Sequence, residues 1–147
     1  MIQVVSIIKF KEYYWIYAQS RVVNGPWIAD DPFIKLPLNI DGATFIDSIE
    51  IALNNSKQDV PLPNDWSDFG KDYLQKMGLK SKKELLGGTR SCDIEKSDHA
   101  VEIIPTRNLG VKGGGFVFLT PLKITLPNII SDNEFFIKIQ EAFAKSE

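Results

Sequence analysis

The sequence predicts an α+β fold in which a mixed, mostly antiparallel sheet of about six strands packs with helices. Three observations lead to this class. Residues 25–56 align without a gap on residues 115–146, and each segment reads as a strand followed by an amphipathic helix. Runs rich in β-branched and aromatic residues near the N-terminus and after residue 90 predict further strands. Strands and helices also fail to alternate regularly, which argues against a doubly wound parallel sheet.

The two aligned segments share eight identical positions: Gly25/Gly115, Ile34/Ile124, Leu36/Leu126, Pro37/Pro127, Phe45/Phe135, Ile49/Ile139, Ala52/Ala142 and Ser56/Ser146. In each predicted helix the apolar residues recur at i, i+1, i+4, i+7 and i+8, so they share one face. Asp41 and Ser131 stand at the N-cap positions. Because one strand and one helix cannot bury such a face alone, we expect both helices to pack on one sheet. The register favours a duplicated unit over two unrelated units of similar composition.

The N-terminal part predicts strands from Val4 to Phe10 and from Tyr13 to Gln19, joined by a tight polar turn. Asn24-Gly25-Pro26 is a turn signal, and Asp30-Asp31-Pro32 predicts a second turn. We therefore expect the strand of the first repeated unit to begin at Ile34.

A helix from about Thr44 to Asn55 completes the first unit. A helical insert is then predicted at about residues 64–88. Its first helix begins after Asp65 and ends at Gly78, and its second, short helix begins at the capping residue Ser81. The insert separates the two repeated units.

The chain then returns to strands. Ser91–Lys96 and Ala100–Thr106 predict a hairpin, and the glycine-rich stretch from Asn108 to Gly115 predicts a flexible loop. Phe116–Leu119 and Leu122–Leu126 predict the strands that lead into the second repeated helix.

Length and composition predict one globular domain over residues 1–147, with 44% hydrophobic and 24% charged residues. A net charge of −2 argues against a nucleic-acid-binding surface. No apolar run reaches the roughly 20 residues of a membrane helix, and Met1–Val5 lacks the features of a secretory leader. With one cysteine, no internal disulfide can form, which fits a reducing compartment. We therefore expect a cytoplasmic location and no membrane partner.

The charge is unevenly distributed along the chain. Residues 24–70 carry eight acids and two bases, a net charge of −6, whereas residues 71–123 carry ten bases and six acids, a net charge of +4. The acidic stretch either attracts a basic partner or is an ordinary solvated surface. Charge alone leaves both interpretations open.

No catalytic, metal or cofactor site is predicted. The single histidine, His99, lies at a predicted hairpin turn, and Cys92 is expected to be a small buried hydrophobe. A Cys92–His99 pair across that hairpin is conceivable but disfavoured. One histidine and one cysteine cannot form a typical zinc site, and Lys112 with the following glycines lacks the phosphate-loop spacing.

Several phrases of the sequence resemble a known family. They are Ile34-Lys35-Leu36-Pro37-Leu38, the helix end Ala52-Leu53-Asn54-Asn55-Ser56, Met77-Gly78-Leu79-Lys80-Ser81, Pro105-Thr106 and Gly114-Gly115-Phe116. In this order they resemble contact-dependent growth inhibition (CDI) immunity proteins of the CdiI type. The resemblance covers about residues 30–146, and the N-terminal strands do not contribute to it.

The resemblance implies a non-enzymatic cytoplasmic inhibitor that binds the C-terminal toxin domain of a cognate cell-surface effector, very often a nuclease. Because contact residues vary with the toxin in such a family, the candidate contacts follow from physical arguments. A phosphate-gripping nuclease surface is basic, and an acidic face complements it. Tryptophans are favoured anchors of interfaces. The predicted partner-binding residues are Trp27, Asp30, Asp31, Asp65, Trp66 and Asp68.

Two other interpretations remain. The first is a small ligand-binding or enzymatic α+β domain that uses the 108–115 loop, which would require a cavity shared by Cys92, Arg107 and Lys112. The second is a structural or regulatory subunit with an open strand edge. The inhibitor interpretation predicts a monomer or weak dimer in the absence of the partner.

Overall fold

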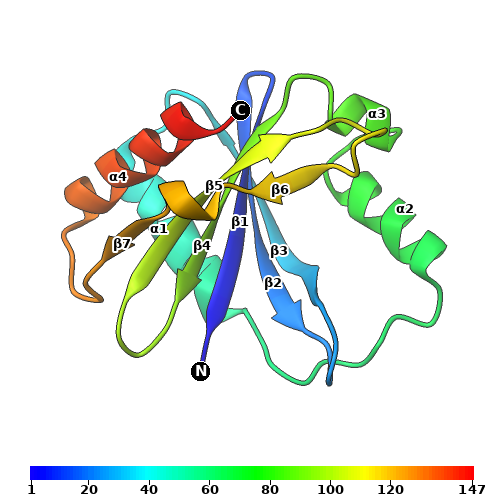
Figure 1. The fold of residues 1–147 in the computed structure, drawn as a ribbon, viewed down its shortest axis with the longest axis horizontal. Helices are drawn as coiled ribbons and strands as arrows, with labels where there is room; N and C mark the ends of the chain where they lie inside the picture. Colours follow the sequence, from blue (N-terminus) through cyan, green and yellow to red (C-terminus); the bar gives the residue numbers. More distant parts are fainter.

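The computed structural model describes all 147 residues and shows a seven-stranded sheet with four α-helices (Figure 1). The strands are β1 (Gln3–Phe10), β2 (Tyr13–Arg21), β3 (Trp27–Pro37), β4 (Arg90–Lys96), β5 (Val101–Asn108), β6 (Phe116–Phe118) and β7 (Ile124–Leu126). The helices are α1 (Gly42–Asn54), α2 (Trp66–Lys76), α3 (Lys82–Leu85), α4 (Asp132–Lys145) and the 3₁₀ turn η1 (Thr120–Leu122). All pairings between named strands are antiparallel, which confirms the predicted α+β class. None of the α-helices has both the length and the apolar character needed to cross a bilayer.

The sheet is ordered β3-β2-β1-β4-β5, and both β6 and β7 pair with β5. β7 pairs with residues 101–103 at the beginning of β5, and β6 pairs with residues 106–108 at its end. The N-terminal strand β1 is therefore the central strand, between β2 and β4. β3 and the β6–β7 segment form the two outer edges.

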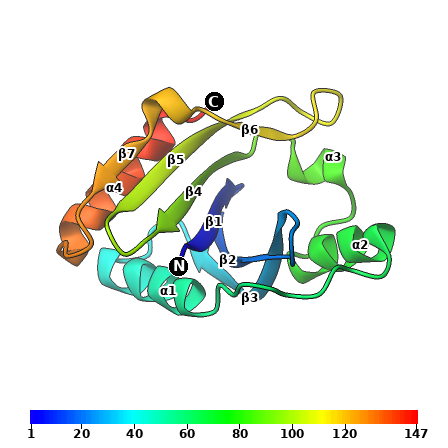
Figure 2. The ribbon, with the colours of Figure 1, turned by 60° about the horizontal axis from the view of Figure 1, so that its bottom comes forward.

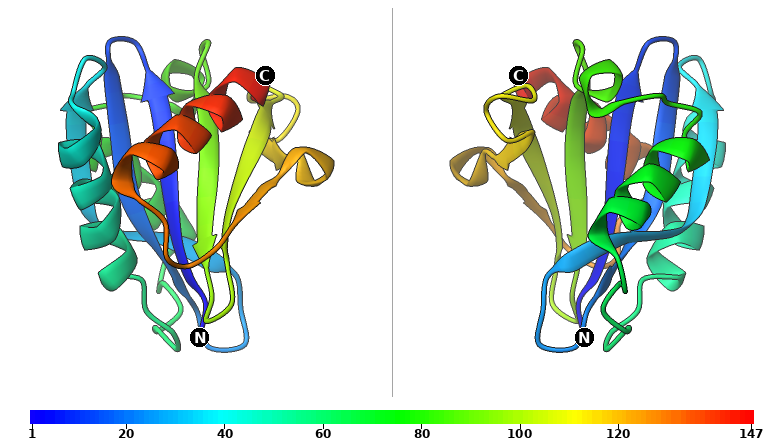
Figure 3. Two further views of the ribbon diagram at one scale, coloured as in Figure 1. Left: turned by 90° about the vertical axis from the view of Figure 1, so that its left-hand side faces the viewer. Right: turned by 90° about the vertical axis from the view of Figure 1, so that its right-hand side faces the viewer.

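Helices α1 and α4 cover one face of the sheet side by side, as Figure 3 shows. Phe45, Ile49 and Ala52 of α1 are fully buried there. The residues at the equivalent positions of α4, Phe135, Ile139 and Ala142, are buried as well. The expectation that both repeated helices pack on one sheet is confirmed, because they contribute to the same apolar cluster. Their origin by duplication stays a prediction.

The helical insert lies on the opposite face of the sheet (Figure 2). Asp65 caps α2 as predicted, because its side chain accepts hydrogen bonds from the backbone N–H groups of Ser67 and Asp68. Gly78 follows the helix with a φ of 68°, a left-handed conformation that glycine adopts without strain. No residue within α2 is fully buried, so this helix is held less firmly than α1 and α4.

The predicted turn at Asp30-Asp31-Pro32 is wrong. β3 runs without interruption from Trp27 to Pro37, and the pairing with β2 shifts register between Tyr17 and Ala18. Tyr17 pairs with Phe33 and Ala18 pairs with Asp30, so Asp31 and Pro32 are two extra residues in a bulge. Local composition indicates a turn, but pairing with β2 on both sides keeps the chain extended.

The region after β5 also differs from the expectation. The predicted strand at 122–126 is shorter, because Thr120–Leu122 forms the turn η1 before β7. The 109–115 loop is closed by hydrogen bonds, including one of 2.8 Å from Leu109 N to Gly115 O. The Asn108 side chain donates to the carbonyl oxygens of Leu86 and Thr89, at 3.0 and 2.9 Å. The predicted flexible loop is thus fixed at its base to the chain that follows α3.

Candidate functional site

Two adjoining clefts lie on the face of the sheet that carries α2 and α3. Figure 2 shows α2 and β6 on either side of this face. The polar cleft has a volume of about 180 Å³ and is lined by Ser6, Ile8, Tyr17, Gln19, Ser91, Asp93, Thr106, Phe116 and Phe118. The apolar cleft has a volume of about 360 Å³ and is lined by Gly70, Tyr73, Leu74, Lys82, Leu85, Leu86, Val111, Gly114, Gly115 and Phe116. Phe116 belongs to both linings, so the clefts adjoin there, and together they are called the groove.

The floor of the polar cleft follows from strand register. Ser6 of β1 stands opposite Tyr17 of β2 and Asp93 of β4, so the three side chains are neighbours on one face. Because side chains alternate along a strand, the adjacent Ile7 and Cys92 point to the other face, where α1 and α4 pack. These strands are therefore apolar on one face and partly polar on the other.

Asp93 is a buried carboxylate without a cationic partner. Its side chain accepts hydrogen bonds from Ser6 Oγ at 2.8 Å and from Gln19 Nε2 at 3.1 Å, and Gln19 also donates to Ser6 Oγ. Burial raises the pKa of Asp93 to about 6, although the two hydrogen bonds act in the opposite direction. The side chain is therefore mostly ionised at neutral pH, at a site 7% exposed to solvent.

Tyrosines connect α2 to this floor. The hydroxyl oxygens of Tyr17 and Tyr73 lie 3.0 Å apart, and the ring of Tyr17 stacks on Phe33 with centroids 4.9 Å apart. Burial raises the pKa of Tyr73 to about 12 and that of Tyr17 well above its usual value. Both hydroxyls are neutral at physiological pH, so they contribute hydrogen bonds and no charge.

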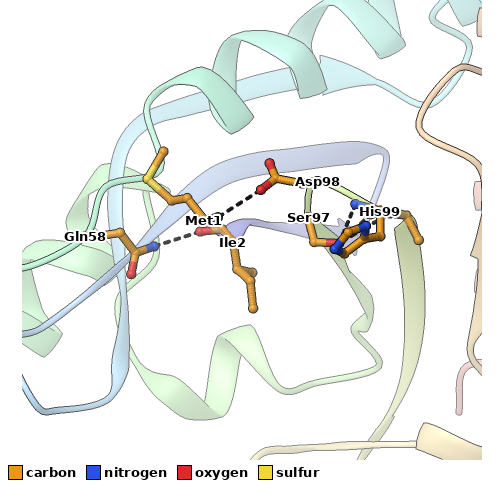
Figure 4. A network of polar contacts seen from close by, with 7 residues as sticks. Met1, Ile2, Gln58, Ser97, Asp98 and His99 are labelled. Atoms are coloured by element: carbon orange, nitrogen blue, oxygen red, sulfur yellow. Dashed lines mark hydrogen bonds and ion pairs between the residues drawn. The ribbon is translucent and has the colours of Figure 1, made fainter.

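The structure does not bring Cys92 and His99 together. Cys92 is fully buried in β4 opposite Pro105, and burial raises the pKa of its thiol well above the usual value. His99 is exposed in the hairpin turn, where its backbone N–H donates to Ser97 Oγ at 3.3 Å (Figure 4). That turn instead lies against the chain start, since the Met1 amine is 3.6 Å from Asp98. Cys92 is thus the small buried hydrophobe that the sequence predicts.

The remaining groups considered for chemistry are also dispersed. Arg107 forms an ion pair with Glu147, and Lys112 lies with Lys83 at a shallow cleft that shares Leu86 and Val111 with the apolar cleft. Neither residue lines the polar or the apolar cleft. No group of three or more His, Cys, Asp or Glu side chains is arranged to hold a metal ion.

The six predicted partner-binding residues fall into two groups. Trp27, Asp30 and Asp31 lie on β3, where Asp30 accepts a 2.6 Å hydrogen bond from Ser20 and Asp31 is 3.1 Å from the Lys76 ammonium. Burial opposes the charge of Lys76, but its contacts with Asp31 and Asp72 raise its pKa overall. Part of the negative charge on β3 is therefore already compensated within the chain.

The second group, Asp65, Trp66 and Asp68, lies at the beginning of α2. Trp66 is 49% exposed and packs edge-to-face on Phe69, while Asp68 is exposed in the first turn. Lys76, which contacts Asp31, stands at the other end of α2, about 15 Å along the helix from Trp66. Neither Trp27 nor Trp66 is a core residue, so both are accessible to a partner. Their role in binding stays a prediction.

The sequence prediction did not identify Asp93, Ser6 or Gln19. A signal was present, because Asp93 stands between the apolar residues Cys92 and Ile94 in a predicted strand. An acid at such a position indicates either a polar cleft or a strand with one solvated face, and the alternation pattern alone favours the second.

The family model described as "CDI immunity protein", CdiI, matches residues 3–146. The chain belongs to the CDI immunity protein family. The match includes β1 and β2, which were outside the resemblance seen in the sequence. In this CDI immunity protein, the groove is formed entirely by residues within the matched range.

Solved structures share the fold of the CDI immunity protein at low sequence identity. A protein of unknown function from Neisseria meningitidis matches with a TM-score of 0.80 and 20% identity, covering 100% of this chain and 96% of the other. The CdiA-CT/CdiI toxin and immunity complex from Yersinia pseudotuberculosis matches with a TM-score of 0.75 and 16% identity, covering 100% and 98%. No curated protein matches the sequence.

Proposed function

We propose that this CDI immunity protein binds the C-terminal toxin domain of its cognate CdiA effector in the cytoplasm and neutralises it. The observation that carries the proposal is the family match over residues 3–146. A structural neighbour from Yersinia pseudotuberculosis is itself a complex of a CdiA-CT toxin with a CdiI immunity protein. We also propose that residues 1–147 act as a single immunity-type domain built from the units 25–56 and 115–146 around the insert.

Neutralisation on this proposal is stoichiometric, because the chain holds the toxin without transforming it. The dispersal of Cys92, His99 and Arg107 supports a non-enzymatic mechanism, since the buried thiol of Cys92 has neither the histidine nor the arginine beside it. The twisted sheet with two open edges and a groove offers an extended surface of the kind that a protein partner covers.

The proposed target is a nuclease toxin. Its phosphate-binding surface would be basic, and the acidic stretch of residues 24–70 would accelerate association with it. In this proposal Trp27 and Trp66 are the buried anchors of the interface. The negative charge that attracts the toxin comes from Asp30, Asp31, Asp65 and Asp68. The Asp68 side chain forms no ion pair or hydrogen bond within the chain, whereas the side chains of the other three acids do, so Asp68 is the most direct reporter.

The function is tested by expressing the toxin domain encoded beside this gene, with and without the chain. We expect growth arrest without the chain, full growth with it, and a 1:1 complex on gel filtration. A toxin domain that is harmless in cells lacking the chain would contradict the proposal. Nuclease activity is checked separately, by incubating the purified toxin with DNA and RNA, with and without the chain.

The acidic surface is tested by Asp68→Lys, which reverses one exposed charge. We expect the association rate constant at low salt to fall about threefold, with a weaker salt dependence, because long-range attraction is reduced. Asp47→Lys is the matched control, because it makes the same charge change at an exposed residue of α1 on the opposite face of the sheet. If the two variants associate equally fast, the interface does not include the beginning of α2.

One observation favours a second candidate, a ligand-binding domain that uses the 108–115 loop. Gly114 and Gly115 line the apolar cleft, whose volume of about 360 Å³ is within the range of small-molecule sites. Its proposed chemistry depends on Cys92, which is buried on the other face. Full protection of cells by a Cys92→Ala, His99→Ala double variant would exclude these two residues from the function.

A further inference from the structure

We infer that the polar cleft is the receptor for one lysine or arginine side chain of the toxin domain, with Asp93 as its counter-charge. This inference deepens the proposed function and rests on it. It names the chemistry of one toxin side chain and the place where that side chain binds. The exposed acids of β3 and α2 identify no such individual contact.

The first argument is that Asp93 is held in place as an acceptor but lacks a cation. A carboxylate has about four acceptor positions, and Ser6 and Gln19 fill only two of them. No lysine or arginine forms an ion pair with Asp93, and none lines the polar cleft. Buried carboxylates are normally paired or metal-bound, and no metal-binding cluster is present. An incoming ammonium or guanidinium group would complete the site.

The second argument is the local charge. Residues 71–123 are positively charged as a whole, yet the charged residues that strand register brings nearest to Asp93 on β4 and β5 are acids. Glu95 lies two residues further along β4, and Glu102 of β5 stands opposite Glu95. Only Glu102 has a cationic partner, with Lys123 at 2.9 Å. Lys123 offsets one of these two acids, so Asp93 and Glu95 keep a negative charge beside the cleft without an ion pair of their own.

The third argument is shape. The polar cleft, at about 180 Å³, is smaller than the roughly 300–1,000 Å³ of small-molecule sites, so it fits a side chain better than a ligand. Phe116 and Phe118 line it, and Phe118 is 55% exposed. Aromatic rings beside a carboxylate suit a long basic side chain, whose apolar stem packs on the rings while its charged head reaches the acid. The adjoining apolar cleft has room for a neighbouring apolar residue of the toxin.

The fourth argument is specificity. Covering the cleft with an apolar or acidic residue would leave Asp93 buried and without water, which is strongly unfavourable. A toxin with a cation at this point avoids that cost, whereas a non-cognate toxin does not. Asp93 therefore discriminates between partners as well as binding one.

The test uses the full-length chain and a catalytically inactive variant of the toxin domain encoded beside it. Asp93→Asn keeps the shape of the side chain and removes the charge. We expect the dissociation constant to rise about 30-fold or more, mainly through faster dissociation. The control Asp47→Asn removes the same charge on the opposite face and should change the constant less than twofold. A change below threefold for Asp93→Asn would overturn the inference while leaving the proposed function intact.

A structural role for Asp93 is separated from a binding role by a second measurement. The melting temperature of free Asp93→Asn at pH 7.5 should equal or exceed that of the wild type, because the variant removes an uncompensated buried charge. If the variant melts lower, Phe118→Ala decides the question, since this exposed side chain can be removed without loss of the fold. It should weaken binding about five- to tenfold, and an unchanged affinity would count against the inference.

The partner residue is found from the toxin side. Each exposed lysine and arginine of the toxin is changed to glutamine and measured against wild-type and Asp93→Asn chains. One of them should weaken binding to the wild type at least tenfold and have little further effect on Asp93→Asn, as a double-mutant cycle requires. If no basic residue couples to Asp93, the inference is wrong. If the wild-type chain does not bind the toxin at all, the proposed function fails with it.

Discussion

The two faces of the sheet differ in how completely they are buried. The face under α1 and α4 is closed by aromatic and aliphatic side chains, and Phe45 there packs edge-to-face on both Tyr14 and Phe136, with ring centroids 4.9 and 5.3 Å away. The face under α2 and α3 has a smaller apolar cluster beside an open groove with Asp93 on its floor. The same strands supply both faces, because their side chains alternate.

The difference separates stability from recognition. Burial on the first face supplies the hydrophobic free energy that stabilises the fold. The second face can therefore keep a charge and hydrogen-bonding groups that contribute to binding a partner and not to the stability of the free chain. Changes on the first face should therefore reduce stability, and removing the charge from the polar cleft of the second face should reduce binding while leaving stability equal or higher.

The largest expected effect is on the first face. Phe45→Ala removes a fully buried ring and should lower the free energy of unfolding by about 3–5 kcal/mol. Phe33→Ala, its counterpart on the second face, removes a half-buried ring stacked on Tyr17 and should cost about half as much. Urea denaturation of both variants gives the comparison. Equal losses would show that the two faces stabilise the fold equally.

The second effect concerns Asp93 and pH. Because the folded-state pKa of about 6 lies above the ordinary value, the folded chain binds more protons than the unfolded chain between about pH 4 and 6. The contribution of Asp93 to stability is therefore most favourable below pH 4 and is lost as pH rises to 6. A shift of about 2 pKa units corresponds to about 3 kcal/mol. Asp93→Asn should thus be more stable than the wild type at pH 7.5 and equally stable at pH 4.

The comparison with Asp93→Asn isolates this effect from other groups. The titratable and charged side chains around Asp93 are Tyr17, Tyr73, Glu95, Glu102 and Lys123, together with Cys92 beside it in the chain. All are present in both proteins, so the difference in melting temperature across pH reports on Asp93. If the melting temperatures of the two proteins differ by the same amount at every pH from 4 to 7.5, ionisation of Asp93 does not destabilise the folded state.

The smallest effect compares two helix caps of the same chemistry. Asp41 caps α1 by accepting from Thr44 N at 2.9 Å, and Asp65 caps α2 in the same manner. Asp41→Ala should lower the global free energy of unfolding by about 1 kcal/mol, because α1 is part of the main core. Asp65→Ala should instead release α2 locally, seen as faster amide hydrogen exchange confined to that helix. A global loss from Asp65→Ala would show that the two faces unfold together.

Most elements could be predicted because their signals are local and periodic. The helices α1 and α4 each carry an N-cap residue and an apolar face at helical spacing. α1 is found within two residues of its predicted bounds, and α4 begins directly after its predicted cap, Ser131. The insert was equally readable, since Asp65, Ser81 and Gly78 mark its boundaries. Prediction of the fold class therefore followed from short stretches of chain.

The wrong and the missing predictions share a cause, because contacts between distant parts of the sequence determine the structure at these positions. Asp30-Asp31-Pro32 has the composition of a turn, but β2 pairs on both sides of it and holds the strand extended. The groove is a harder case, because Asp93, Ser6 and Gln19 come from three strands and meet only through their register. No short stretch of sequence contains that arrangement, so the candidate site could not be found before the fold was known.

The two outer edges of the sheet affect whether copies of the chain associate with one another when no toxin is bound. Beyond β5 the edge consists of two strands of three residues each, separated by η1 with Pro121, so it offers no continuous ladder to an added strand. On the other edge, β3 contains a bulge, Pro32 and the exposed Lys35. Proline, charge and short length all discourage strand addition by a second molecule. An inhibitor that waits in the cell for its target can thereby accumulate without forming fibres of its own.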